Sequence, residues 1–308
     1  KVILADDATI AVKTNNTAVL SGGLDTATYA LTVAGGGTLK SSYSADATIS
    51  ALAVNEASTF EVKSVGNVSM QSVSLDNGTT LQYSRNNDSV HVGPVKMTIA
   101  SLQAGNQASD VVTLAQTGKA GRIEIAELSG VGLLKVDNQS LSNITASVLV
   151  SGTSQFDGDI SVLSSYDGQR DMLFGTNGHS TLSRAQVQLT SVATNNSWIG
   201  FVLAGDGTQS IQVAGVSTGN GITATQSYLL SSNLPYSSTG SDKPFGSSSQ
   251  AVTGISDDIA RTLEIVGSGT KNFGGTVLSG VNLLMNGTGT QKFTGNLDAF
   301  NGTVEVKN

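Results

Sequence analysis

Six residues that could do acid–base chemistry fall within a short stretch in the middle of the chain. They are four carboxylates, one guanidinium and one imidazole: Asp157, Asp159, Asp167, Asp171, Arg170 and His179. In Asp157-Gly158-Asp159 both carboxylates would lie on the same side of an extended strand, because side chains alternate along it. Glycoside hydrolases use such carboxyl pairs, one as the acid and one as the base or nucleophile. One interpretation is therefore a polysaccharide hydrolase or lyase with Asp157, Asp159, Asp167 and Asp171 as weak catalytic candidates.

The same residues also fit a purely structural interpretation. Asp157-Gly158, Asp167-Gly168 and Asn177-Gly178 are dipeptides typical of turns, where the acids are solvated. No hydrolase signature surrounds them, so we favour the turns and assign no catalytic residue. A serine-protease interpretation, with Ser154 as the nucleophile and His179 as its base, is rejected because the strand pattern already places Ser154 in a turn.

Metal and cofactor chemistry has little support in the sequence. The two histidines, His91 and His179, are far apart, and the chain has no cysteine. Histidine and thiolate sites for zinc are therefore not expected. Gly35-Gly36-Gly37 lacks the aspartate of the calcium-binding glycine-rich repeat. We expect no metal and no cofactor.

A binding surface is the alternative to a catalytic site. Trp198, with Tyr228, Tyr236 and Phe245, could form a surface that stacks on sugar rings near the long segment 231–258, which is rich in Ser and Gly. Insertions of this kind often carry function on repeat scaffolds. A spacer without a role explains the segment equally well, and Trp198 could simply be a large scaffold residue.

All these residues must be positioned by a repeating scaffold, which is clearest near the C-terminus. Segments 263–275 and 283–295 share the pattern Leu-x-(Ile/Met)-x-Gly-x-Gly-Thr-x-x-Phe-x-Gly, with an offset of 283 − 263 = 20 residues. A weaker copy is expected at 201–213, about three periods earlier. A period of about 20 residues is typical of a solenoid.

The N-terminal part repeats with a period of 21 residues. Leu31-x-Val33, Leu52-x-Val54 and Val73-x-Leu75 are each followed by an apolar residue six positions later, and Ile10-x-Val12 extends the series backward. Short alternating runs predict strands with one buried face, and the Gly- and Asn-containing gaps predict turns. We predict an all-β parallel β-helix of about 20–21 residues per coil, or about 15 coils if the period held throughout.

The whole chain, 1–308, reads as one such domain. Segments 92–146 and 157–184 keep the alternation but are expected to form less regular coils. Segment 231–258, which contains Pro235 and Pro244, is expected to be a loop insertion that leaves the stack.

Composition excludes several classes of protein. Charged residues make up 13%, about half the usual share, and the 38% of hydrophobic residues are patterned, which argues against disorder. The net charge is −7, and 16 basic residues are spread along the chain, so no nucleic-acid partner is expected. No run approaches the ~20 apolar residues that span a bilayer, so we expect no membrane insertion. The chain starts at Lys1 without a signal-like segment, and we expect it to be part of a larger protein.

The C-terminal repeat resembles a known family. Gly287-Thr288-Gly289-Thr290, Phe293-Thr294-Gly295 and Phe300-Asn301-Gly302-Thr303-Val304 resemble the autotransporter-associated β-strand repeat of bacterial autotransporter passenger domains. The resemblance covers 263–305 well and 201–213 less closely. In that family the repeat marks right-handed parallel β-helix coils of secreted or surface-exposed Gram-negative proteins, many of which are adhesins.

The resemblance implies a right-handed β-helix at the bacterial cell surface, associated with the outer membrane, or outside the cell. We expect a role in adhesion, with a host-surface glycan or protein as the partner. Two alternatives stay open. One is a β-helix carbohydrate-active enzyme. The other is an extracellular fibre subunit that self-associates end to end through the unpaired strand edges of its open coils.

Overall fold

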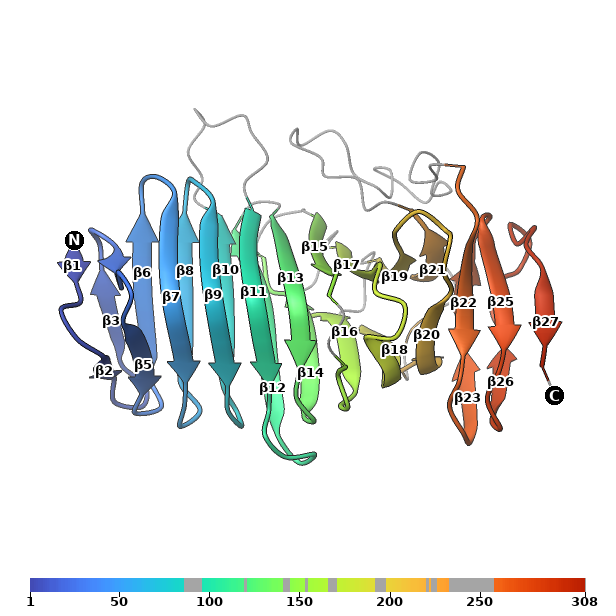
Figure 1. The fold of residues 1–308 in the computed structure, drawn as a ribbon, viewed down its shortest axis with the longest axis horizontal. Helices are drawn as coiled ribbons and strands as arrows, with labels where there is room; N and C mark the ends of the chain where they lie inside the picture. Colours follow the sequence, from blue (N-terminus) through green and yellow to red (C-terminus); the bar gives the residue numbers. More distant parts are fainter. Residues whose placement is uncertain are drawn as a thin grey trace.

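The fold is a stack of parallel strands, and the residues that the structure describes contain no helix. The computed structural model describes residues 1–85, 96–118, 121–140, 145–152, 155–165, 171–191, 198–219, 222, 226–232 and 258–307. Within these residues the strands form a parallel β-solenoid of about ten turns (Figure 1). The described part contains no helix that is long and apolar enough to cross a bilayer.

Two long sheets form the walls of the solenoid. The twelve-stranded sheet contains β3 (Thr17–Leu20), β6 (Thr38–Tyr43), β8 (Thr59–Ser64), β10 (Thr80–Arg85), β12 (Val111–Gly118), β14 (Leu133–Asn138), β16 (Ile160–Ser164), β18 (Leu182–Ser191), β20 (Ile211–Thr218), β22 (Arg261–Ile265), β25 (Val281–Met285) and β27 (Val304–Val306). The eleven-stranded sheet contains β2 (Ala8–Ala11), β5 (Ala30–Ala34), β7 (Ala47–Val54), β9 (Val68–Leu75), β11 (Lys96–Ala104), β13 (Arg122–Ser129), β15 (Thr145–Val150), β17 (Asp171–Thr176), β19 (Ile199–Leu203), β21 (Ser227–Ser231) and β24 (Thr276–Val277).

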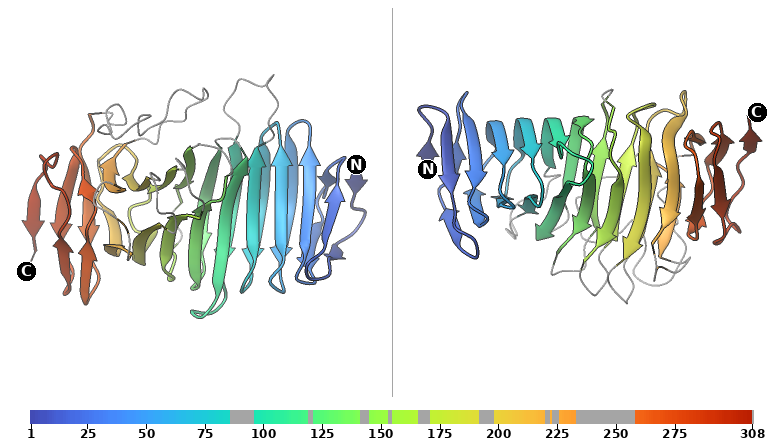
Figure 2. Two further views of the ribbon diagram at one scale, coloured as in Figure 1. Left: turned by 180° about the vertical axis from the view of Figure 1, so that it is seen from behind. Right: turned by 90° about the horizontal axis from the view of Figure 1, so that it is seen from below.

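Two short sheets complete the structure. β1 (Val2–Ile3) pairs with β4 (Leu24–Asp25), and β23 (Thr270–Phe273) pairs with β26 (Thr290–Phe293). The chain alternates between the long sheets, so each coil gives one strand to each. In Figure 1 the near strands β7, β9 and β11 run downward and the far strands β6 and β8 run upward as the chain advances, which makes the coil right-handed. The termini lie at opposite ends of the stack (Figure 2).

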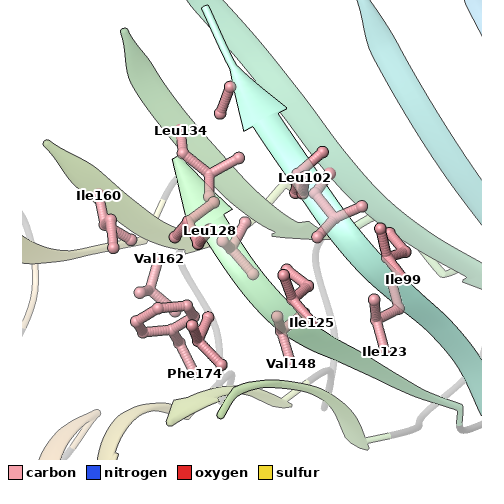
Figure 3. Packing of buried hydrophobic residues seen from close by; sticks show 14 of the residues in the cluster. Ile99, Leu102, Ile123, Ile125, Leu128, Leu134, Val148, Ile160, Val162 and Phe174 are labelled. Carbon is pink, nitrogen blue, oxygen red and sulfur yellow. The ribbon is translucent and has the colours of Figure 1, made fainter. Parts of the chain in front are cut away.

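The core is built from apolar columns that run along the stack. Leu31 pairs with Leu52, and Leu52 with Val73, in adjacent strands of the eleven-stranded sheet. Their side chains are no more than 3% exposed. Figure 3 shows residues of this kind from both long sheets facing one another, among them Ile125, Val148 and Ile160. Burying each such side chain stabilises the fold by about 1.5–3 kcal/mol, so alternation at a fixed coil period is sufficient to specify the stack.

The predicted period is confirmed at both ends of the solenoid. Leu39 pairs with Phe60 (60 − 39 = 21), and Leu263 pairs with Leu283 (283 − 263 = 20). Coils in the middle are longer: Val162 pairs with Leu189, 27 residues on. Longer connections between strands are accommodated within the stack, since loop length costs little free energy. The number of turns is therefore about ten, and the extrapolated number of about 15 is wrong.

Two registers predicted from the sequence are also wrong. Ile10 pairs with Val33 and not with Leu31. The segment at 201–213 is not a repeat in register, because Phe201 belongs to the eleven-stranded sheet, whereas Leu263 pairs with Ile211. Counting by a constant period fails wherever coils of another length intervene.

The glycines of the C-terminal repeat are explained by close stacking of neighbouring turns. A Cβ on Gly287 would lie 2.3 Å from the Gly267 oxygen, and one on Gly295 would lie 2.0 Å from the Gly275 oxygen. Between these glycines, the Phe273 and Phe293 rings meet edge to face with centroids 6.0 Å apart. The glycines of the repeat therefore allow the backbones of neighbouring turns to approach closely, and the phenylalanines pack against each other between them.

Candidate functional site

Asp157 and Asp159 lie just before β16 and both contact the following coil. The Asp157 carboxylate forms an ion pair with Arg184, with 3.0 Å between Oδ1 and Nη1. The Asp159 Oδ1 atom accepts a hydrogen bond from the backbone N–H of Gln186 at 3.0 Å. The structure thus brings these two sequence candidates together on the side of the solenoid where β16 and β18 begin.

Asp171 lies elsewhere. It is 2% exposed at the start of β17, and it accepts a hydrogen bond from the backbone N–H of Trp198 at 3.2 Å. The backbone oxygen of Asp171 is also bound by Asn138, which pairs with Ser164 at the far end of β16. Asp159 and Asp171 are therefore separated by the length of β16, roughly 17 Å at about 3.3 Å per residue. Paired carboxyls in glycosidases are at most about 9.5 Å apart. Asp167 and Arg170 lie outside the described residues.

The aromatic candidates are also separated from Asp159. Trp198 is 8% exposed and packs with Leu173, Val202 and Leu230 in a small cluster distinct from the main core. Its ring faces are therefore covered in this structure. Tyr236 and Phe245 lie outside the described residues, as does most of segment 231–258.

Sequence reasoning missed a polar network around Glu264. The Ser210 hydroxyl donates to the Glu264 carboxylate, and Asn286 Nδ2 donates to it at 2.6 Å. Burial alone would raise the pKa of Glu264, but hydrogen bonds from Ser210, Asn286 and Gln212 together outweigh burial and hold that pKa below its usual value.

His179 does not complete a catalytic serine pair within this network. Its Nδ1 atom meets the backbone oxygen of Ser210, not the hydroxyl. The hydroxyl of Ser210 is directed to Glu264. Ser154, the nucleophile considered in the rejected protease interpretation, lies outside the described residues. The network consequently orients side chains and does not provide the geometry of nucleophilic catalysis.

An open groove of about 560 Å³ lies beside Asp159. Three consecutive parts of the stack line it: the start of β16 with β18, the middle of β20, and the turns that follow β22 and β25. We call it the polar groove, and its lining residues are Asp159, Ser183, Arg184, Gln186, Ala214, Val266, Gly267, Ser268, Lys271, Asn286, Gly287 and Thr288.

Two local features shape the polar groove. The first is an irregularity in β18, where the register changes between Leu182, paired with Val213, and Gln186, paired with Gly215. Two extra residues of β18 are accommodated there, and such bulges redirect side chains. The second is the bare backbone of Gly267, where a Cβ would lie 2.1 Å from the Ala214 oxygen. The turn after β22 can therefore lie directly against β20.

Charges in the polar groove are unevenly compensated. Arg184 is paired with Asp157, as described above. Lys271 is half-buried, and no carboxylate of the described residues lies within 4 Å of its ammonium group. Asp159 is the one acid in the lining. The polar groove thus offers a cation with no ion-pair partner among the described residues, next to one carboxylate, two amides and three hydroxyl groups.

Metal chemistry has no structural support in the described part of the chain. It contains no group of three or more His, Cys, Asp or Glu side chains placed to hold a metal ion. Comparisons with known proteins add no assignment: no family model, no curated protein and no solved structure matches the chain. Inference about function therefore depends on the polar groove and its chemistry.

Proposed function

We propose that this chain is the scaffold of a surface-exposed or secreted bacterial protein that acts in adhesion. Its partner is a glycan or a protein of a host surface, and the polar groove is the contact site. The observation that carries the proposal is the lining of this groove, in which hydrogen-bonding side chains lie beside the bare backbone of Gly267 and Gly287. Such a lining complements a ligand rich in hydroxyl groups.

Rigidity supports this role. Most of the lining residues lie on paired strands or in the tight turns that directly follow them, so little conformational entropy is lost when a ligand binds. Gln186 Nε2 donates to the Ser217 hydroxyl at 2.6 Å, and Asn286 is held by Glu264. Both amide groups are therefore oriented before a ligand arrives.

The cellular location is part of the same proposal. It rests on the resemblance of the C-terminal repeat to the coils of autotransporter passenger domains. Stacked glycines at Gly267 and Gly287 show that this repeat has a defined structural role. A bacterial outer surface is the place where that kind of coil would present a groove to a host.

A carbohydrate-active enzyme is the second candidate, because Asp159 lines the polar groove and Asp157 lies two residues away. Asp157 is bound to Arg184 and Asp159 to a backbone N–H, so neither is disposed as an unengaged acid or base. Adhesion needs no such group and fits the arrangement better. End-to-end self-association remains a prediction, to which the exposed Val304 and Val306 of β27 are relevant.

Glycan-array and host-protein binding by the whole chain tests the proposal. Ser268→Trp places a large ring in the polar groove, and Gln71→Trp on the exposed face of β9 is the matched control. We expect wild type and Q71W to bind the same ligands and S268W to lose them. Binding that survives S268W, or absence of any ligand for the wild-type chain, would contradict the proposal. A variant with 231–258 replaced by a short Gly/Ser link shows whether that segment contributes.

A further inference from the structure

Lys271 gives the polar groove a chemical preference that the proposed function does not specify. Its side chain is half-buried, and among the described residues no acid lies within ion-pair distance. An ammonium group without an acid at ion-pair distance can form a charge-assisted bond with an anionic group of a ligand. The chain as a whole carries a net charge of −7, so this cation is not part of a general basic surface.

The position of Lys271 is fixed by its neighbours. A Cβ on Gly215 would lie 2.8 Å from Lys271 Cγ, so the aliphatic stem of the lysine rests on bare backbone of β20. Gln291 lies opposite Lys271 on the paired strand β26. Its side chain accepts a hydrogen bond from the backbone N–H of Val216 at 3.1 Å and donates one to the backbone oxygen of Val216 at 2.9 Å. These two bonds fix the β23–β26 sheet against β20. The ammonium group is thus presented from an ordered stem.

The other charges around the polar groove define what the anion must be attached to. Arg184 is neutralised by Asp157 at 3.0 Å. Asp159 is the carboxylate of the lining, and it would repel an anionic group of a ligand placed next to it. Carboxylates accept hydrogen bonds from hydroxyl groups, and charge-assisted bonds of this type are strong. The arrangement therefore suits a ligand with an anionic group at one end and hydroxyl groups at the other.

We infer that the polar groove binds acidic sugars, with the anionic group on Lys271 and ring hydroxyls on Asp159. The inference rests on the proposed function and narrows it to one class of glycan. The anionic group is a carboxylate, as in a uronic acid, or a sulfate ester; both present oxygen atoms to the ammonium group. Neutral sugars lack the group that compensates Lys271 and bind more weakly.

The test is calorimetric titration of the whole chain with defined oligosaccharides. Hyaluronan oligosaccharides supply the carboxylate, and their methyl esters remove its charge without changing the ring hydroxyls. Dextran sulfate and dextran oligosaccharides supply the sulfate and its neutral counterpart. We expect the charged member of at least one pair to bind about tenfold more tightly than its neutral counterpart, the effect of one charge-assisted hydrogen bond. The pair that responds identifies the anion.

Variants separate this inference from the proposed function. Lys271→Met retains the stem and removes the charge, and Lys292→Met on the exposed side of β26 is the matched control. We expect K271M to abolish the preference for the charged sugar and K292M to keep it. Equal binding of charged and neutral sugars, or a preference that survives K271M, overturns the inference while glycan binding itself stands. No binding to any sugar overturns the inference together with the glycan form of the proposed function.

Discussion

Replacement of Arg261 is expected to open the solenoid locally, where segment 231–258 leaves it. Arg261 is 1% exposed, and its guanidinium group donates to three segments. Nε and Nη2 bind the Gly205 oxygen, the former at 2.7 Å, and Nη1 binds Ser231 Oγ at 2.9 Å and the Ile259 oxygen at 3.3 Å. The Ser231 hydroxyl in turn donates to the Ile259 oxygen at 2.7 Å. Arg261 therefore fastens the turn after β19 to both described ends of the long segment.

The magnitude follows from these contacts. Arg261→Met keeps most of the apolar stem but removes every guanidinium donor, which leaves the Gly205 oxygen without these bonds. Hydrogen bonds to charged groups contribute about 1.5–3 kcal/mol each, and breaking a buried charged network by removing one member costs about 3–5 kcal/mol. We expect a loss of about 3–5 kcal/mol for R261M. R261K should lose less than R261M because its ammonium group retains the charge and can donate to one of these partners. It should still be less stable than wild type, since one ammonium group cannot reach both Gly205 and Ser231 in the manner of the planar guanidinium.

Hydrogen exchange is the suitable assay, because each coil of a solenoid contacts only its neighbours and destabilisation should stay local. Amides of β21 and β22, such as those of Leu230 and Leu263, should exchange faster in R261M. Amides of the N-terminal coils, such as that of Leu52, should be unchanged and serve as the internal control. Protection in β21 and β22 equal to or above that of wild type would refute the reasoning, because it would mean that desolvation of the guanidinium outweighs its hydrogen bonds.

Three further predictions concern stability. Ala57 has φ 54° at a turn position that is glycine in both neighbouring coils, so Ala57→Gly should relieve strain and raise the free energy of unfolding by about 0.5–1 kcal/mol in urea titrations; a lower value would contradict this. Burial raises the pKa of Asp137, so the contribution of this carboxyl group to stability is fully present below the unfolded pKa of about 3.9 and is lost as pH rises through the folded pKa. Asp137→Asn should therefore raise Tm at pH 7, and this gain should vanish near pH 3. A change in Tm that is the same at both pH values would exclude the ionised carboxylate as the cause. Gly287→Val should destabilise the C-terminal coils by at least about 2 kcal/mol in hydrogen exchange, since its Cβ would lie 2.3 Å from the Gly267 oxygen, and wild-type protection would show that the turns can separate.

The stack itself could be predicted because its information is local. Leu31, Leu52 and Leu283 each lie in a short alternating run, and the run repeats at a coil length that the sequence displays directly. A parallel solenoid then follows, since the same inward positions must bury one another. The resemblance of the C-terminal repeat indicated its handedness. Prediction succeeded wherever two adjacent coils have the same length.

The middle registers and the polar groove could not be predicted for the converse reason. Arg184 and Lys271 are 87 residues apart (271 − 184), and they share a groove only because of how many residues each intervening connection absorbs. Turn signals in the sequence mark where strands end but not how far a loop extends before the next coil begins. The partnership of Ser210 and Glu264 was hidden in the same way, because Ile211 pairs with Leu263 across an offset of 52 residues.

The polar groove lies where the solenoid changes coil length, and this is the physical reason for its existence. On one side, Val162 pairs with Leu189 across 27 residues, and on the other Leu263 pairs with Leu283 across 20. In the shorter coils a turn separates β22 from β23 and β25 from β26, so β23 and β26 form a sheet of their own, and β23 lies against the C-terminal half of β20 (Figure 1). Coils of equal length would place corresponding strands and turns directly over one another, and the side of the solenoid would be flat. A change of coil length leaves a step, and at this step glycine backbone, the β18 irregularity and the ammonium group of Lys271 come together.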